Sequence, residues 1–231
     1  LPLYNGTGWH KGGIFINLKG EILTSSFVTK GAVVPFQELR TDVKVAGDAP
    51  KPPYYTPTIY PGRQRFGEVH VWDKHGKKLH EDVVQGLVDL YGVGLDKDNN
   101  VYVMASPTRI LDGERYFDGM TGTIMKFKPG KGKVISENSP LILVPVTDPP
   151  KRPHDIIKGP SPAWVEGAEW FYGSVGYCRK NADQCGRWDA RFALDYYARS
   201  FAPEVRRFNV AVLDSNGNLI LRMGRMGNVD E

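Results

Sequence analysis

Short runs of alternating apolar and polar residues, separated by tight polar turns, recur along this chain. Residues 12–23 alternate on both sides of Lys19-Gly20. This period-two pattern predicts a β-hairpin with one buried face. The same scheme returns at 69–79, 93–103 and 210–221, and more loosely at 124–135. The pattern therefore predicts a series of β-hairpins, which indicates an all-β fold.

An Asp follows the first strand of several of these hairpins. Asp73, Asp96, Asp195 and Asp214 each stand at the head of such a turn. An Asp side chain can accept hydrogen bonds from the backbone two residues on, and a following Gly or Asn adopts the positive φ that a tight hairpin needs. We interpret these four residues as turn formers, because the turn itself explains why they recur.

Two stretches arrange their hairpins in the same order. Residues 91–135 predict two strand pairs joined by a loop, the second pair turning at Gly130. Residues 191–224 repeat this order. Taken alone, Phe192 to Arg199 could form a helix, but its match to 95–104 favours strands. Four strands in about 40 residues is the size of one propeller blade.

These stretches resemble a known repeat. Residues 207–224 look like an NHL repeat, 91–104 look like the first half of another, and 185–230 are similar to large secreted bacterial NHL-type proteins without an assigned activity. The resemblance covers roughly half of the chain. It implies a β-propeller of NHL type with about four to six blades. Residues 1–231 would form one propeller or a portion of one, with irregular insertions near 24–65 and 136–185.

Composition narrows the function classes. The chain has 231 residues, of which 41% are hydrophobic and 24% charged, and 30 basic against 26 acidic residues give a net charge of +4. The basic residues form no stripe interleaved with aromatic residues, which argues against nucleic-acid binding. No run approaches the roughly 20 apolar residues of a membrane-spanning helix.

The two cysteines indicate a compartment. Cys178 and Cys185 lie close together in a polar loop, with a spacing that fits neither a C-x-x-C zinc pair nor haem attachment. A disulfide between them would close a short loop, whereas the alternative is two free thiols in a cytosolic protein. The disulfide interpretation predicts an extracytoplasmic protein, either periplasmic or secreted.

Candidate binding residues concentrate between 149 and 199, a stretch rich in polar and aromatic side chains. The candidates are His154, Asp155, Trp164, Glu166, Glu169, Trp170, Asp189 and Arg191. In propellers such loops line one mouth of the central channel, but caps and surface ion pairs would give the same composition. A weaker metal hypothesis places His70 and His80 as cross-strand neighbours on one hairpin. The sequence contains no G-x-S-x-G elbow, no phosphate-binding glycine loop and no H-E-x-x-H motif, and no catalytic residue is assigned.

The resemblance to NHL propellers is compatible with three functions. The first is a non-catalytic binding or scaffolding propeller that recognises a protein, peptide or carbohydrate through its loop face. The second is a metal-dependent lyase or hydrolase with a divalent ion in the central channel; no cofactor is otherwise indicated. The third is a subunit of a larger cell-envelope or redox assembly, in which another chain completes the propeller.

Overall fold

The computed structural model is built almost entirely from β-strands. It describes residues 3–4, 13–28, 68–87, 90–117, 121–137, 144–146, 148–178, 188–189, 191–225 and 227. In these ranges the helical element is a short 3-10 helix, η2 (Val205–Arg207), and no α-helix occurs. The all-β prediction is therefore confirmed. Within the same ranges, no helix is long and apolar enough to cross a membrane.

The first sheet, sheet A, comes from the N-terminal part of the chain. Strand β3 pairs antiparallel with β1, β2 and β4, and β5 extends the sheet beyond β4. Its strands are β1 (Leu3–Tyr4), β2 (Ile14–Ile16), β3 (Ile22–Val28), β4 (Glu68–Trp72) and β5 (Lys78–His80). Residues 29–67, which hold most of the insertion predicted near 24–65, lie outside the described residues.

Two further sheets have four antiparallel strands each. Sheet B runs in the order β16–β11–β8–β7, and sheet C in the order β19–β20–β21–β22. Sheet B consists of β7 (Leu90–Leu95), β8 (Val101–Ala105), β11 (Gly122–Phe127) and β16 (Ala168–Val175). Sheet C consists of β19 (Ala193–Leu194), β20 (Ser200–Glu204), β21 (Asn209–Leu213) and β22 (Leu219–Met223). The strands expected between Phe192 and Arg199 are thus confirmed, with Asp195 at their turn.

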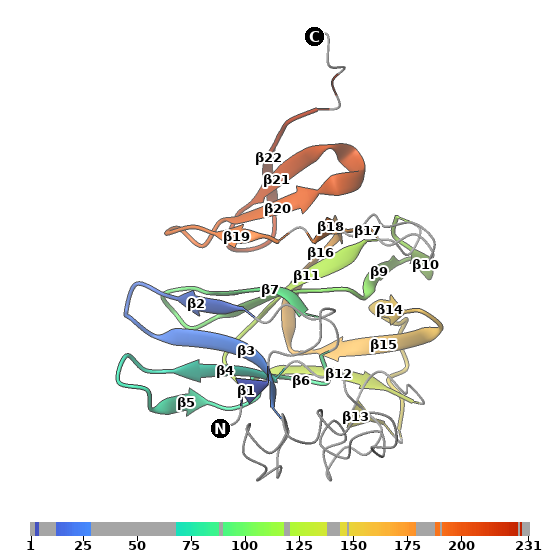
Figure 1. The fold of residues 1–231 in the computed structure, drawn as a ribbon. Helices are drawn as coiled ribbons and strands as arrows, with labels where there is room; N and C mark the ends of the chain where they lie inside the picture. The colour runs from blue at the N-terminus through green and yellow to red at the C-terminus, as the bar shows by residue number, and fades with distance from the viewer. Residues whose placement is uncertain are drawn as a thin grey trace, which may run out of the picture.

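Sheet B lies between the other two sheets, as Figure 1 shows, and is buried on both faces. Alternate side chains of β8 enter different cores: Val101 and Val103 pack with sheet A, whereas Tyr102 and Met104 pack with sheet C. This explains why β8 reads as a continuous apolar run, since a strand covered on both sides has no polar face.

A glycine allows close approach of the next sheet both where sheet A packs on sheet B and where sheet B packs on sheet C. A Cβ atom on Gly13 of sheet A would lie 2.7 Å from Val93 of sheet B, and one on Gly92 of sheet B would lie 3.0 Å from Phe192 of sheet C. Gly13 and Gly92 each precede the head of their turn by four residues. Sheets A, B and C therefore stack by the same contact, repeated in the same direction.

The hairpin turns of these sheets follow one hydrogen-bonding pattern. In the turn headed by Asp214, one carboxylate oxygen accepts from the backbone N–H groups of Asn216 and Asn218, both at 2.8 Å. Gly217 occupies the position of positive φ. Four other turns repeat these bonds, headed by Asn17, Asp73, Asp96 and Asp195. The interpretation of the Asp residues as turn formers is confirmed by these contacts.

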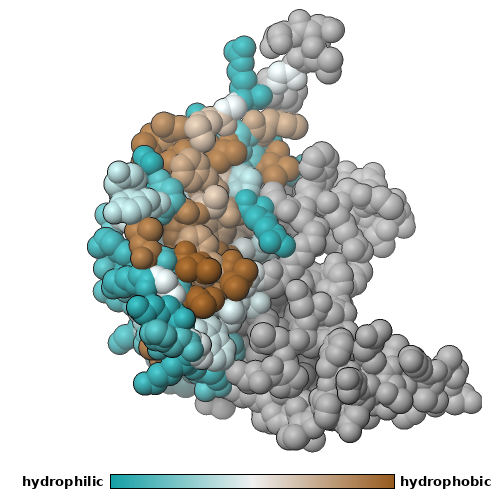
Figure 2. Space-filling view, turned by 60° about the vertical axis from the view of Figure 1, so that its left-hand side comes forward, coloured by the Kyte–Doolittle hydropathy of each residue, from teal (hydrophilic) through white to brown (hydrophobic). Residues whose placement is uncertain are grey.

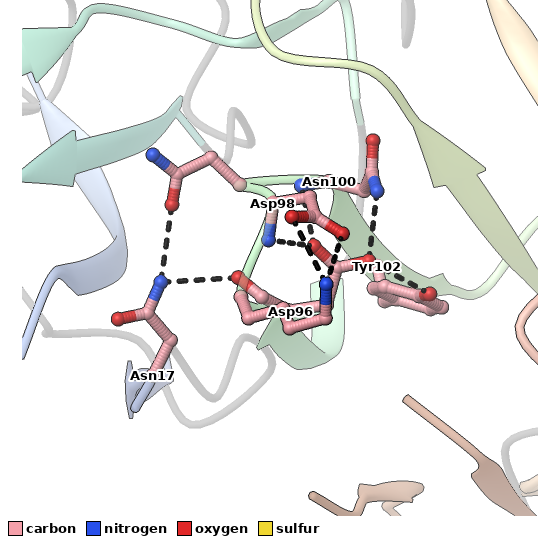
Figure 3. Close-up of polar contacts among 7 residues, drawn as sticks. Asn17, Asp96, Asp98, Asn100 and Tyr102 are labelled. Carbon is pink, nitrogen blue, oxygen red and sulfur yellow. Dashed lines mark hydrogen bonds and ion pairs between the residues drawn. The ribbon is translucent and has the colours of Figure 1, made fainter. Parts of the chain in front are cut away.

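Asn17 does more than form its own turn. Its amide nitrogen Nδ2 donates to the backbone carbonyl of Asp96 at 3.0 Å and to Oδ1 of Asn99 at 3.1 Å (Figure 3). The carboxylate of Asp96, which heads the neighbouring turn in sheet B, also accepts a hydrogen bond from the Tyr102 hydroxyl at 3.2 Å. The first turn of sheet A is thereby fastened to the first turn of sheet B.

The strand pair predicted around Gly130 is wrong. Strand β11 pairs with β8 and β16, whereas β12 (Gly132–Ser136) pairs with β15 (Ser161–Glu166) in a different sheet. Gly130 does adopt the positive φ of a turn. No Asp or Asn heads this turn. The chain therefore leaves sheet B at this point, and β16 supplies the fourth strand later.

The chain between β8 and β16 supplies most of a separate seven-stranded sheet. Its order is β10–β9–β14–β15–β12–β13, with β6 paired to β12. The remaining members are β6 (Val84–Gln85), β9 (Thr108–Leu111), β10 (Glu114–Arg115), β13 (Val144–Pro145) and β14 (Ile156–Lys158). Beyond β16, β17 (Tyr177–Cys178) pairs with β18 (Trp188–Asp189). The described part of 136–185 thus contains regular strands, where an irregular insertion was expected.

Candidate functional site

The predicted binding residues first form a group around β14 and β15. The ring of His154 stacks on Trp164, with ring centres 4.2 Å apart. Trp164 donates its indole hydrogen to the carbonyl oxygen of Arg152 at 2.9 Å. Asp155 accepts from the Arg152 guanidinium at 2.6 Å and from the backbone N–H of Val165 at 2.8 Å. These contacts fasten the segment before β14 onto β15.

Arg109 joins this group to sheet B. Its Nη1 donates to the carbonyl oxygen of Asp155 at 2.6 Å, and its guanidinium lies 4.3 Å from the centre of the Phe171 ring. Burial lowers the pKa of Arg109, while the nearby carboxylate of Asp155 opposes that shift. A cation placed between a carboxylate and an aromatic face is already fully engaged, so we assign this group to structure.

A second group lies between sheets B and C. The carboxylate of Glu169 is 2.9 Å from Nζ of Lys126, and that hydrogen bond is the main reason why the pKa of Glu169 is lowered. Lys126 and Trp170 both donate to the carbonyl oxygen of Ser215, at 3.0 and 3.1 Å. Trp170 also meets Tyr102 edge to face. These residues therefore bind the last turn of sheet C to sheet B.

The other predicted positions do not join either group. Glu166 is exposed on β15 opposite Lys133, and Arg191 is exposed before β19. The backbone of Asp189 belongs to β18, but its side chain lies outside the described part of the structure. The same holds for Cys178, and all of Cys185 lies outside it, so the disulfide stays a prediction.

The strand register of sheet A shows where the two histidines of the metal hypothesis, His70 and His80, lie. His80 stands opposite Val71, and the buried His70 stands opposite Thr24. Nδ1 of His70 accepts a hydrogen bond from the backbone of Asp82 at 3.2 Å. Among the described residues, no three His, Cys, Asp or Glu side chains gather into a group that could hold a metal ion.

A buried carboxylate outside the predicted set stabilises the same interface. Glu204 of sheet C is almost fully buried, and its oxygens lie 2.6 Å from Nε of Arg222 and 2.8 Å from the Tyr172 hydroxyl of sheet B. Burial first, and then the bond to Glu204, raise the pKa of Tyr172 to about 12. Because each group satisfies another, this network stabilises the interface.

The candidate surface is the edge where the first turns of the three sheets lie in a row. We call this edge the turn edge; it comprises residues 17–21, 96–100 and 195–199. Asn17 joins the first turn to the second, as described above. Leu194, just before the third turn, packs over Gly94 of sheet B, where an added Cβ atom would lie 3.2 Å away.

Two aromatic side chains project from the turn edge. Tyr196 and Tyr197 are both largely exposed, with ring centres 5.0 Å apart in an edge-to-face arrangement. The guanidinium of Arg199 lies 5.3 Å from the centre of the Tyr197 ring and is held there by Asp195 at 2.6 Å. The pKa of Lys97 in the second turn is raised, mainly by its hydrogen bond to Asp98.

The sequence reasoning missed the tyrosine pair because it treated 192–203 only as a match to a strand pair. The signal was available: Tyr196 and Tyr197 directly follow the turn head Asp195. In the other turns these two positions hold Leu18-Lys19, Lys74-His75, Lys97-Asp98 and Ser215-Asn216, so a pair of tyrosines there departs from the pattern. Comparison with known proteins adds no assignment, since neither a family model nor a curated protein matches this chain.

Proposed function

We propose that this chain is a non-catalytic binding platform of the NHL propeller type, which holds a peptide segment of a partner protein at the turn edge. Sheets A, B and C would be three of its blades. The assignment of these sheets as blades is supported by their repeated architecture. Each has antiparallel strands and a first turn headed by Asp or Asn, and the sheets stack face to face in one direction.

The exposed pair Tyr196–Tyr197 carries the proposal. Large aromatic side chains are enriched at protein interfaces, and they lose little conformational entropy on binding because each has only two side-chain torsions. Here the pair stands on a turn held by two backbone hydrogen bonds to Asp195, each 2.9 Å long. Such a surface is preorganised, which reduces the cost of ordering it around a ligand.

The charges beside the pair favour a peptide over a strongly charged ligand. Lys97 is paired with Asp98 at 3.0 Å and Arg199 with Asp195 at 2.6 Å, so the basic side chains nearest the tyrosines are compensated. A polyanion would have to break these pairs. A peptide can place an apolar or aromatic side chain on the rings and use its backbone for hydrogen bonds to the rim.

The experiment is a selection of random phage-displayed peptides on the immobilised chain. Peptides are then counter-screened against the double variant Tyr196→Ala/Tyr197→Ala and against the control Leu111→Ala, which removes an exposed apolar side chain on β9, outside the turn edge. We expect peptides with dissociation constants of about 1–100 μM that lose at least tenfold in affinity on the double variant only. If no selected peptide distinguishes the double variant from the wild type, the proposal is wrong.

A further inference from the structure

The repeated stacking of sheets leaves one position of the repeat uncovered in sheet A. Val93 and Leu95 stand three residues and one residue before the turn head Asp96, and sheet A buries them to 9% and 1% exposure. The corresponding residues of sheet A, Ile14 and Ile16, are 70% and 60% exposed. The same place in the repeat is thus covered in sheet B and open in sheet A.

In sheet C it is the other face that is uncovered, the face that corresponds to the one sheet B packs against sheet C. In sheet B, Trp170 on the outer strand is covered by sheet C, and only 9% of it is exposed. By register, the residue of sheet C that corresponds to Trp170 is Leu221, and the one that corresponds to Tyr172 is Met223. Leu221 and Met223 are 45% and 46% exposed. The open face of sheet C is therefore the kind that another sheet covers in this fold.

The two open faces are complementary in kind. We call Ile14, Ile16, Ile22 and Trp72 the rear face of sheet A, and Phe201, Val210, Leu221 and Met223 the forward face of sheet C. Each set lies on one side of its sheet. At the two contacts among sheets A, B and C, a forward face meets a rear face: sheet A on sheet B, and sheet B on sheet C.

We infer that the forward face of sheet C binds the rear face of sheet A of a second copy, head to tail. The contact continues the stacking already present twice in the chain, and both faces present aliphatic and aromatic side chains of the kind that stable interfaces bury. In the view of Figure 2, hydrophobic residues gather in the middle of the described surface, with hydrophilic residues to their left and below. Such a contact is heterologous, so it uses two different patches of each copy.

Sedimentation of the full chain across micromolar concentrations tests this inference. The wild type should self-associate, whereas Ile16→Lys on the rear face and Leu221→Lys on the forward face should each weaken association by about tenfold or more, because each buries an unpaired charge. Leu111→Lys is the control, since Leu111 on β9 of the seven-stranded sheet is 43% exposed, close to the 45% of Leu221, and lies outside both faces. Circular dichroism confirms that each variant is folded.

Mixing the two variants identifies the geometry. Ile16→Lys keeps a forward face and Leu221→Lys keeps a rear face, so an equimolar mixture should form a heterodimer although each variant alone stays monomeric. A wild type that is monomeric throughout the concentration range overturns the inference. It is equally overturned if Ile16→Lys alone still dimerises, since that result indicates symmetric pairing. Neither outcome depends on the tyrosine pair of the turn edge, so the proposed peptide site is tested separately.

Discussion

Gly217 lies directly against the indole ring of Trp170, so that a Cβ atom added to this glycine would stand 2.7 Å from the ring. The glycine belongs to the last turn of sheet C and the tryptophan to the outer strand of sheet B. Two requirements therefore coincide at one residue: a φ of +82° and the absence of a side chain.

Replacing Gly217 with Ala separates these requirements when it is compared with Gly76→Ala. Gly76 has a φ of +83° in the equivalent turn of sheet A, but no atom lies within 4 Å of an added Cβ. Gly76→Ala should lower the free energy of unfolding by about 1–2 kcal/mol through backbone strain alone. Gly217→Ala should lose about 1–3 kcal/mol more through overpacking. Urea denaturation measures both, and equal losses would contradict the contact with Trp170.

The comparison of Asp214→Asn with Asp214→Ala tests the turn itself. Asn17 forms the same turn with an amide oxygen, so Asn at 214 should keep the two backbone hydrogen bonds and cost little at neutral pH. Ala removes them and should cost about 1 kcal/mol or more. Thermal unfolding of both variants against the wild type is the measurement. Equal destabilisation by Asn and Ala would show that the carboxylate charge, and not its geometry, forms the turn.

Acid should lower the free energy of unfolding more for the wild type than for Asp214→Asn. The pKa of Asp214 is lowered, first by the side-chain hydrogen bond from Asn218 and then by its backbone N–H. A carboxyl whose pKa is depressed in the folded state stabilises the fold fully above its unfolded pKa, near 3.8, and loses that contribution as the pH falls through the lower value. Unfolding measured below pH 4 should therefore show a smaller pH slope for Asp214→Asn.

Much of this fold could be predicted from the sequence because the turn chemistry is local. The position of an Asp before Gly or Asn is visible along the chain, and the structure confirms those turns. The departure at Gly130 could not be predicted in this way, since whether β12 pairs with β11 or with β15 depends on contacts far apart in sequence. A turn without an Asp or Asn head was the only local warning.

The candidate site was harder to predict, because residue type does not separate an exposed side chain from one engaged in an interface. His154, Asp155, Glu169 and Trp170 have the composition of a binding site, yet they hold strands and sheets together. Tyr196 and Tyr197 lie on the exposed part of a turn, a position that follows from Asp195 as the turn head but that residue type alone does not reveal.

Tyr172→Phe should lower stability at neutral pH, and its difference from the wild type should shrink in alkaline solution. The hydroxyl donates to the buried Glu204 at 2.8 Å, and its loss should cost about 1.5–3 kcal/mol at neutral pH. The pKa of Tyr172 is raised from 10.0 to about 12, so its contribution is complete below pH 10 and is lost as the pH rises through that interval. Chemical denaturation between pH 9 and about pH 11 should show a shallower decline for Tyr172→Phe than for the wild type. The exposed Tyr196→Phe is the control and should follow the wild type.

Asn17→Asp should destabilise the chain although it restores the Asp that heads the other four turns. The oxygen Oδ1 would still accept from the backbone of Lys19 and Glu21. The second oxygen, however, would replace an amide group that donates to Asp96, Asn99 and the Glu21 carboxylate at 2.9–3.1 Å. Because Asn17 is buried, we expect a loss of about 3 kcal/mol or more in the free energy of unfolding.

Asn17→Ala provides the reference for this variant. Alanine loses the hydrogen bonds of Nδ2 and also the two that Oδ1 accepts, but it places no buried charge beside other oxygens. We therefore expect it to be destabilised less than Asn17→Asp. The repulsion from Glu21 would also raise the pKa of the new carboxyl, which means that mild acid should protonate it and recover part of the lost stability. Denaturation at pH 7 and pH 5 measures both effects. If Asn17→Asp is as stable as the wild type at pH 7, the amide of Asn17 does not join sheet A to sheet B.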